Sequence, residues 1–221
     1  MSSVSSPRPH PLPVELLDTL PAEHPDARHS RRDLRVFNAA LGNARWFAQI
    51  LPRQLRAGER VLEVGAGEGD LGLTMHRRGI RWDGIDLAPR PPAWPRDAAW
   101  HRGNVFHFDE WPQYPVIAGN LILHHFTDHQ LGELGARASE HARLLVLGDL
   151  RRGRIQQWLF AAFARAVGAN RVSRHDGWLS IAAGFRGHEL PRLLGLDPRH
   201  WAWQVPRTHF FAYRLVAFRK A

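Results

Sequence analysis

Residues 60–71 read RVLEVGAGEGDL, and this stretch decides the fold. Its first half is an apolar run interrupted only by Glu63, a pattern typical of a strand buried inside a parallel sheet. Three glycines then follow at alternate positions, namely Gly65, Gly67 and Gly69. A helical pattern of apolar residues begins at Leu71. The stretch predicts a strand, a glycine turn and a helix, in which bare backbone approaches a ligand at the carboxyl end of the strand.

The spacing of the glycines narrows the kind of ligand. A dinucleotide fingerprint, G-x-G-x-x-G, needs a third glycine where this chain has Asp70, and the sequence contains no G-K-[ST] phosphate loop. The pattern that remains is E-x-G-x-G-x-G, with Glu63 two residues before the first glycine. It resembles motif I of the class I S-adenosylmethionine (SAM)-dependent methyltransferases.

The resemblance implies an α/β fold with a Rossmann-like, mostly parallel sheet. Seven strands would follow the order 3-2-1-4-5-7-6, with strand 7 antiparallel, helices flanking the sheet and an N-terminal helical segment. Two apolar segments around Pro206-Arg207-Thr208 predict the closing hairpin of this sheet. The chain is expected to divide into a disordered tail (1–13), a helical cap (14–58) and a SAM-binding methyltransferase domain (59–221).

The next predicted strand, RWDGIDL, ends at Asp86. A carboxylate at the end of the second strand of such a unit can accept hydrogen bonds from both ribose hydroxyls. By resemblance, Asn104 stands where the family usually has an acid that contacts the adenine, and its amide oxygen keeps an acceptor there. The resemblance assigns cofactor contacts to Glu63, Gly65, Ala66, Gly67, Asp86, Leu87, Asn104, Val105, Asn120 and Leu121.

Residues 115–126, PVIAGNLILHHF, carry the second signal. They read as a short buried strand with Asn120 at its carboxyl end, followed by an apolar stretch and a histidine pair. The segment resembles the motif IV region of small-molecule methyltransferases, although Pro115 replaces the common first Asp. Because a histidine beside the methyl group can accept a proton near neutral pH, His124 and His125 are candidate catalytic residues. The alternative is that one packs and the other caps the following helix.

Two other interpretations of the histidines stay open. His175, next to Asp176 in a segment predicted to be a loop (171–185), is a competing candidate base, or else a histidine on a surface loop. His125, Asp128 and His129 have the i, i+4 spacing of metal ligands on a helix. That set offers no convincing third ligand, so no metal is assigned.

The composition excludes several classes of site. The chain has no cysteine, which excludes a disulfide framework, a thiolate metal site and a cysteine nucleophile. The first residues lack an apolar signal segment and no apolar run reaches the ~18 residues of a membrane span, so a cytoplasmic protein is expected. The net charge is +9, and residues 151–199 carry nine arginines against three acids. This local excess either faces an anionic substrate or forms a solvated surface.

These absences also bear on the substrate. An N-P-P-Y motif for amino-group methylation of adenine or glutamine is missing, and nine tryptophans, including Trp178, suit a flat apolar acceptor. We expect O-methylation of a small aromatic or polyketide-like metabolite, with SAM as cofactor and S-adenosylhomocysteine (SAH) as product. Nucleic acid and membrane are not expected as partners. Two alternatives stay open: an RNA methyltransferase, supported only by the net charge, and a SAM-binding protein without catalysis.

Three local patterns predict how the helices begin and pack. Ser30 has the position of an N-cap, with Asp33 at the third helical residue, and Thr127 with Gln130 predicts a capping box. Residues 155–167 predict an amphipathic helix. Its inward side chains are expected to be Trp158, Leu159, Phe163 and Val167.

Overall fold

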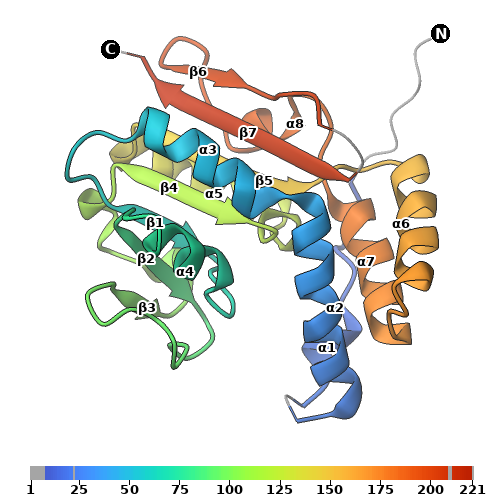
Figure 1. The fold of residues 1–221 in the computed structure, drawn as a ribbon. Coiled ribbons are helices and arrows are strands. Elements are labelled where there is room, and N and C mark those ends of the chain that lie inside the picture. The colour runs from blue at the N-terminus through green and yellow to red at the C-terminus, as the bar shows by residue number, and fades with distance from the viewer. Residues whose placement is uncertain (1–7, 22, 209–210, 221) are drawn as a thin grey trace, which may run out of the picture.

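A seven-stranded sheet forms the centre of the computed structural model, which describes residues 8–21, 23–208 and 211–220. The strand order is β3-β2-β1-β4-β5-β7-β6, and β7 is antiparallel to both of its neighbours (Figure 1). The strands are β1 (Val61–Val64), β2 (Trp82–Asp86), β3 (Trp100–Arg102), β4 (Val116–Asn120), β5 (Leu144–Leu150), β6 (Trp201–Gln204) and β7 (Ala212–Arg219). The expected order and the closing hairpin are confirmed.

Strand β1 lies in the middle of the parallel part of the sheet and is buried along its whole length. Val64 pairs with Ile85 of β2 on one side and with Gly119 of β4 on the other. Because all three strands are parallel, their carboxyl ends reach the same edge of the sheet. The segments that follow β1, β2 and β4 therefore meet there.

Helices cover both faces of the sheet. On one face, α3 (Asn43–Gln54) and α4 (Asp70–His76) pack Phe47 and Met75 on alternate strand residues such as Val61. On the other face lie α5 (Asp128–His141), α8 (Glu189–Leu193) and the 3₁₀ helices η1 (Val105–His107) and η2 (Trp111–Gln113). A capping box between Thr127 and Gln130 starts α5, as predicted.

A second group of helices lies beyond the carboxyl ends of the parallel strands. In Figure 1, α2 (Pro25–Leu41) stands beside α7 (Arg171–Ala183) and α6 (Arg154–Ala166), at the end toward which β4 points. The short helix α1 (Leu16–Thr19) packs on α7. Among the described residues, no helix has the length and apolarity needed to cross a membrane.

Helix α2 begins earlier than predicted. Pro25 is its first residue, a position where the missing N–H of proline costs nothing, and the Nδ1 of His24 accepts a hydrogen bond from the N–H of Asp26 (3.1 Å). Ser30, the predicted N-cap, is instead buried within the helix, where its Oγ donates to the Oδ1 of Asn170 (3.1 Å). This serine therefore connects α2 to the start of α7 and does not cap the start of a helix.

The predicted loop over 171–185 is also wrong, because most of it forms α7. The side chain of Asn170 caps this helix by accepting a hydrogen bond from the N–H of Ser173 (2.8 Å). Gly177, a loop signal in the sequence, is required by packing inside the helix. A Cβ on this residue would lie 2.1 Å from the Cζ of Phe160 in α6. The glycine thus marks a close contact between two helices.

Helix α6 presents a different face from the predicted one. Its buried side chains are Phe160 and Ala164, while Trp158 is 64% exposed. Leu159 and Val167 are exposed as well, and of the predicted inward residues only Phe163 packs against the core. The reason is that α6 lies outermost in its helix group and packs mainly on α7, so a narrow stripe is covered.

The predicted disordered tail (1–13) lies partly outside the described residues, which begin at Arg8. Arg8 itself is buried: its Nε donates to the carbonyl of Ala183 (3.0 Å) and its guanidinium lies over the ring of Phe185. Arg8 therefore packs against the rest of the chain, and the boundary of the expected tail at residue 13 stays a prediction. We call residues 8–20 the N-terminal segment. The other boundaries, at 58 and 59, stay predictions, and positions 209–210 of the hairpin lie outside the described residues.

Candidate active site

The glycine turn (residues 65–69) links β1 to α4 through backbone that favours glycine. Gly65, Gly67 and Gly69 all have positive φ angles, of 67°, 56° and 79°. A Cβ on Gly65 would lie 2.2 Å from the Cγ1 of Ile122, whereas a Cβ on Gly67 would meet nothing within 4 Å. The turn therefore packs its first glycine against the protein and presents its second to open space.

Asp86, the last residue of β2, lies against this turn. Its Oδ2 accepts a hydrogen bond from the N–H of Gly67 (2.8 Å), and its Oδ1 accepts one from the N–H of Ala88 (2.8 Å). The parallel pairing of β1 with β2 brings the turn and this carboxylate to one edge of the sheet. The two features on which the sequence interpretation depends are thus in direct contact.

Glu63 is buried beneath the turn, where the Nε1–H of Trp82 donates to its Oε2 (2.8 Å). Burial raises the pKa of Glu63 to about 8; the Trp82 hydrogen bond opposes this shift, and the carboxylates of Asp86 and Asp70 add to it. A cationic group on a ligand would offset both the burial and the crowding of carboxylates. The position therefore favours a ligand with a positive charge.

The carboxyl end of β4 has unusual backbone. Leu121 has a φ of 58° and is the one non-glycine position with positive φ in the described part of the chain. For a residue with a Cβ this conformation costs about 1–2 kcal/mol, and such strain collects at functional sites. The N–H of Leu121 donates to the carbonyl of Gly148 (2.8 Å), and the Oδ1 of Asn120 accepts from the Nδ2 of Asn43 (2.9 Å). These bonds fix how the chain enters η3 (Leu123–His125).

One cavity, of about 400 Å³, joins the ends of β1, β2 and β4 to the helix group. Most of the predicted site residues line it: Glu63, Gly65, Ala66, Gly67, Asp86, Asn120, Leu121, His124 and His125. The predicted residues that do not line it are Leu87, Asn104, Val105 and His175.

The predicted adenine side of the site does not line the cavity; it consists of Leu87, Asn104 and Val105. Leu87 is 72% exposed, and Val105 is buried in the hydrophobic core. The Oδ1 of Asn104 accepts a hydrogen bond from the N–H of Phe106 (3.0 Å), which caps η1. This oxygen therefore already has a local donor, and a role for these three residues in binding stays a prediction.

His124 is held by a buried carboxylate. Its Nδ1 lies 2.7 Å from the Oδ1 of Asp149, a fully buried residue whose Oδ2 also accepts from the N–H of Leu123 (2.9 Å). Burial opposes a charge on His124, but the Asp149 carboxylate and its hydrogen bond outweigh that effect and raise the pKa of the imidazole. With Nδ1–H donating to Asp149, the Nε2 of the neutral ring carries a lone pair.

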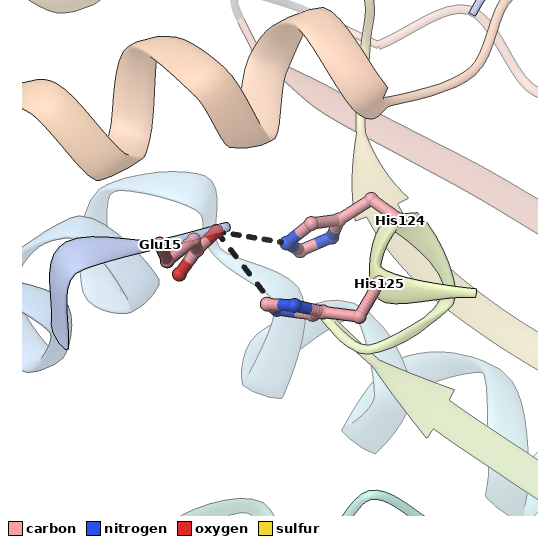
Figure 2. Close-up of side chains that lie close together, drawn as sticks. All are labelled: Glu15, His124 and His125. Atoms are coloured by element: carbon pink, nitrogen blue, oxygen red, sulfur yellow. Dashed lines mark ion pairs between the residues drawn. The ribbon is translucent and has the colours of Figure 1, made fainter. Parts of the chain in front are cut away.

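Glu15, from the N-terminal segment, faces both histidines. Its Oε1 lies 3.9 Å from the Nε2 of His124 and 4.0 Å from the Nε2 of His125, as Figure 2 shows. Burial raises the pKa of Glu15, and the Oγ of Ser180 donates a hydrogen bond to its Oε1. The side chain of His125 is 35% exposed; partial desolvation, with the neighbouring His124, lowers its pKa to about 3. We call Glu15, His124 and His125 the polar end of the cavity.

His175 is not brought to this polar end. Its Nδ1 lies 3.0 Å from the Oδ1 of Asp176, and nearly half of its side chain is exposed. Asp176 does line the cavity, but its two oxygens accept hydrogen bonds from the N–H groups of Leu16 (2.8 Å) and Leu17 (2.9 Å). Asp176 therefore anchors the N-terminal segment on α7.

The sequence interpretation missed Glu15 and Asp149. Glu15 lies 109 positions before His124 in the chain, and no local motif connects the two residues. Asp149 carries a usable signal, since it follows the apolar run of residues 144–148, and an acid near the end of such a strand faces the same edge as the glycine turn. The structure does not bring His125, Asp128 and His129 together as metal ligands, because Asp128 pairs with Arg8.

Comparison with known proteins adds information on the fold. No family model matches the chain, and no curated protein matches it. Among solved structures, the plantazolicin methyltransferase BpumL in complex with SAH is 10% identical, with a TM-score of 0.69 over 92% of this chain and 93% of that chain. The 1,6-didemethyltoxoflavin-N1-methyltransferase of Burkholderia thailandensis is 22% identical, with a TM-score of 0.56 over 87% and 83% of the two chains.

A third structure, the magnesium protoporphyrin IX methyltransferase (ChlM) from Synechocystis PCC 6803 with bound SAH, is 15% identical. Its TM-score is 0.54, and the match covers 86% of each chain. At these identities the likeness concerns the fold. The chain has the Rossmann-like fold of class I methyltransferases, with the strand order expected from the sequence.

Proposed function

We propose that this protein is a SAM-dependent methyltransferase that acts on a small-molecule acceptor. The observation that carries the proposal is the contact between the glycine turn and Asp86 at the rim of one cavity, whose polar end holds two histidines. Solved structures of proteins with the same fold contain SAM or SAH. The motif in the sequence and the geometry of the cavity both favour the same cofactor.

The proposed cofactor contacts follow from the geometry of the turn. Open space at Gly67 lets the ligand approach the backbone, and Asp86 would accept hydrogen bonds from the ribose hydroxyls. Glu63, with its raised pKa, would gain a counter-charge from the ammonium group of the methionine moiety. Asn120 and Leu121 would then border the sulfonium, next to the polar end of the cavity.

The far wall of the cavity suits an apolar acceptor. It is lined by aromatic and aliphatic side chains from α2, α6, α7 and the residue before β7: Leu34, Phe37, Leu41, Phe160, Phe163, Ile181 and Phe211. The polar end supplies the contrasting polar groups. Such a wall favours a flat ring system with one polar group, so we infer O-methylation of a small aromatic or polyketide-like compound.

In the proposed reaction the acceptor oxygen attacks the methyl carbon of SAM, the carbon–sulfur bond breaks, and SAH leaves. The acceptor's proton passes to the Nε2 of His124, whose Nδ1 is fixed by Asp149. Asp149 and Glu15 then stabilise the imidazolium that forms. The protein's contribution is thus to align the acceptor and to receive its proton.

Calorimetry with SAH tests the cofactor assignment. The wild-type chain is expected to bind one SAH, and Asp86→Ala to weaken binding about 10–100-fold, because hydrogen bonds to a charged group contribute about 1.5–3 kcal/mol. Asp97→Ala is the matched control, since the Asp97 side chain is 79% exposed and does not line the cavity. If Asp86→Ala binds SAH as the wild type does while circular dichroism shows it folded, the ribose assignment is wrong.

Transfer of a radiolabelled methyl group from SAM to a panel of phenols, amines and carboxylic acids tests the acceptor class. Label is expected on the oxygen of an apolar phenol, and His124→Ala should slow transfer while leaving SAH affinity within about twofold. Label found on nitrogen would refute O-methylation and leave the methyltransferase assignment intact. Full transfer by His124→Ala would place the proton acceptor elsewhere.

A further inference from the structure

The polar end of the cavity has an arrangement that an acid–base role does not require. Glu15, His124 and His125 each present one ligand atom, and these three atoms lie within 4.8 Å of one another. The separations of 3.9 Å and 4.0 Å between the Glu15 oxygen and the two Nε2 atoms are too long for hydrogen bonds. Ligands around one transition-metal ion, at ~2.1 Å from it, lie roughly 3–4 Å apart. The gap therefore has about the size of a single ion.

The direction of the side chains supports this interpretation. Figure 2 shows both imidazoles reaching from η3 toward the Glu15 carboxylate, which enters from the opposite side. The two rings lie side by side, with centroids 4.3 Å apart. The Nε2 atoms of both rings therefore face one carboxylate oxygen, and a cation placed between them would be shared by all three groups.

The groups behind the three residues have the character of an outer shell of a metal site. The second nitrogen of His124 contacts the buried Asp149 carboxylate (2.7 Å), which fixes Nε2 as the free ligand atom. The Oγ of Ser180 donates to the Oε1 of Glu15 and orients that carboxylate. A carboxylate behind a ligating histidine and a hydrogen bond to a ligating carboxylate are the partners that metal sites commonly have.

We propose that Glu15, His124 and His125 bind a divalent first-row transition-metal ion, with Zn²⁺ as the natural probe. Two imidazoles and one carboxylate are borderline ligands that favour such ions over Mg²⁺ or Ca²⁺. All three residues line the cavity, so a fourth coordination position faces it. The cation would occupy the same lone pair of His124 that accepts the proton in the proposed reaction. Metal and proton thus compete for this atom.

The test uses the full chain without an affinity tag of histidines, freed of metal with a chelator and then desalted. Titration with Co²⁺ is expected to give the visible absorption of a four-coordinate ion at one equivalent per chain, and Zn²⁺ should displace it. Glu15→Gln, His124→Gln and His125→Gln are each expected to weaken Zn²⁺ binding at least tenfold in calorimetry. Circular dichroism verifies that each variant is folded.

Two matched controls separate this site from the other histidines, of which the chain has fourteen in all. His129 lies on the helix after His125, and His175 lies outside the cavity lining. The variants His129→Gln and His175→Gln should therefore bind Zn²⁺ as the wild type does. Asp149→Asn should weaken binding about 10–100-fold, as loss of an outer-shell partner does. Absence of a one-to-one Co²⁺ complex would overturn the proposal, and so would equal loss in His129→Gln.

The outcome is independent of the proposed methyl transfer. SAH affinity, measured in the same variants, depends on the glycine turn and Asp86, none of which is a metal ligand here. Loss of Zn²⁺ binding with SAH binding retained supports the metal site alone. SAH binding without any Zn²⁺ binding removes the metal site and leaves the methyltransferase assignment in place.

Discussion

Gly65, Gly67 and Asp86 come from the turn after β1 and from the end of β2, within one short part of the chain, whereas Glu15, His124 and Asp149 come from three segments spread over most of it. The first group forms the glycine-turn side of the cavity, while Glu15 and His124 belong to its polar end and Asp149 holds His124 from behind. The glycine-turn side follows from local backbone requirements, which leave a motif in the sequence. The polar end depends on long-range packing, which leaves almost no motif in the sequence.

The two sides also differ in how their charges are balanced. At and behind the polar end, each acid has a basic or hydrogen-bonding partner on another segment: Asp149 has His124, and Glu15 has Ser180 and the histidines. On the glycine-turn side, Glu63 shares its surroundings with the carboxylates of Asp86 and Asp70. The acids near the polar end thus have partners within the protein, whereas Glu63 is surrounded by like charges that a cationic group of a ligand would offset.

The largest expected effect concerns the polar end. The Asp149 carboxylate accepts hydrogen bonds from the N–H groups of Leu123 (2.9 Å) and Leu150 (2.7 Å). Asp149→Asn would place an amide N–H₂ against one of these donors. Removing one partner of a buried pair costs about 3–5 kcal/mol, so the free energy of unfolding in urea should fall by that order. The pKa of His124, followed by NMR, should fall as well, because the group that raises it is gone.

Asp83→Asn is the matched control for this prediction. Asp83 is equally buried, but it pairs with Arg60 and accepts a hydrogen bond from the N–H of Ala99 (2.7 Å), so its partners lie away from His124. Its replacement should lower stability in the same way and leave the titration of His124 unchanged. If Asp149→Asn leaves that titration unchanged too, the His124–Asp149 pair has no influence on proton binding.

The next effect concerns the glycine-turn side. Gly65→Ala would place a Cβ 2.2 Å from Ile122 at a φ of 67°, so overpacking and left-handed strain together should cost about 2–4 kcal/mol. SAH affinity should fall with it. Gly58→Ala, at a φ of 79° with nothing within 4 Å, carries the backbone strain alone and should keep SAH affinity. Equal SAH affinity in both variants would contradict a role for the turn in binding.

An effect that depends on pH should separate Glu63 from the other acids. Because its pKa is raised from 4.5 to about 8, the folded state holds a proton that the unfolded chain releases above pH 4.5. The contribution to stability is therefore full below pH 4.5 and is lost as pH rises to about 8, at no more than about 1.4 kcal/mol per pH unit. Glu63→Gln, which stays neutral, should flatten the decline of the melting temperature over this range. An identical decline in both proteins would contradict the raised pKa.

The smallest effect is expected at His175. Its side chain is nearly half exposed and does not line the cavity, so His175→Ala should change stability by less than about 0.5 kcal/mol. Methyl transfer, measured with the labelled cofactor, should stay within about twofold of the wild type. A large loss of transfer with SAH affinity retained would restore His175 as a candidate base.

Several errors of the sequence interpretation share one physical cause. Gly177 suggested a loop, yet it lies inside α7 because Phe160 leaves no room for a side chain. Ser30 suggested a helix start, yet its hydroxyl bonds to Asn170 of a distant segment. In both cases, a contact with a residue elsewhere in the chain decides which residue type is required. Local propensity therefore gave the wrong local structure at the places where α2, α6 and α7 meet.

The sequence by itself indicated the glycine-turn side of the cavity, because glycines with positive φ meet a local backbone requirement, and its resemblance to a family supplied the order of the strands in the sheet. It also pointed to His124 and His125. Only the tertiary structure brought Glu15 and Asp149 to these histidines and placed His175 outside the cavity lining. The reason is that packing and buried charge pairs join distant segments, and their partners cannot be read from spacing along the chain.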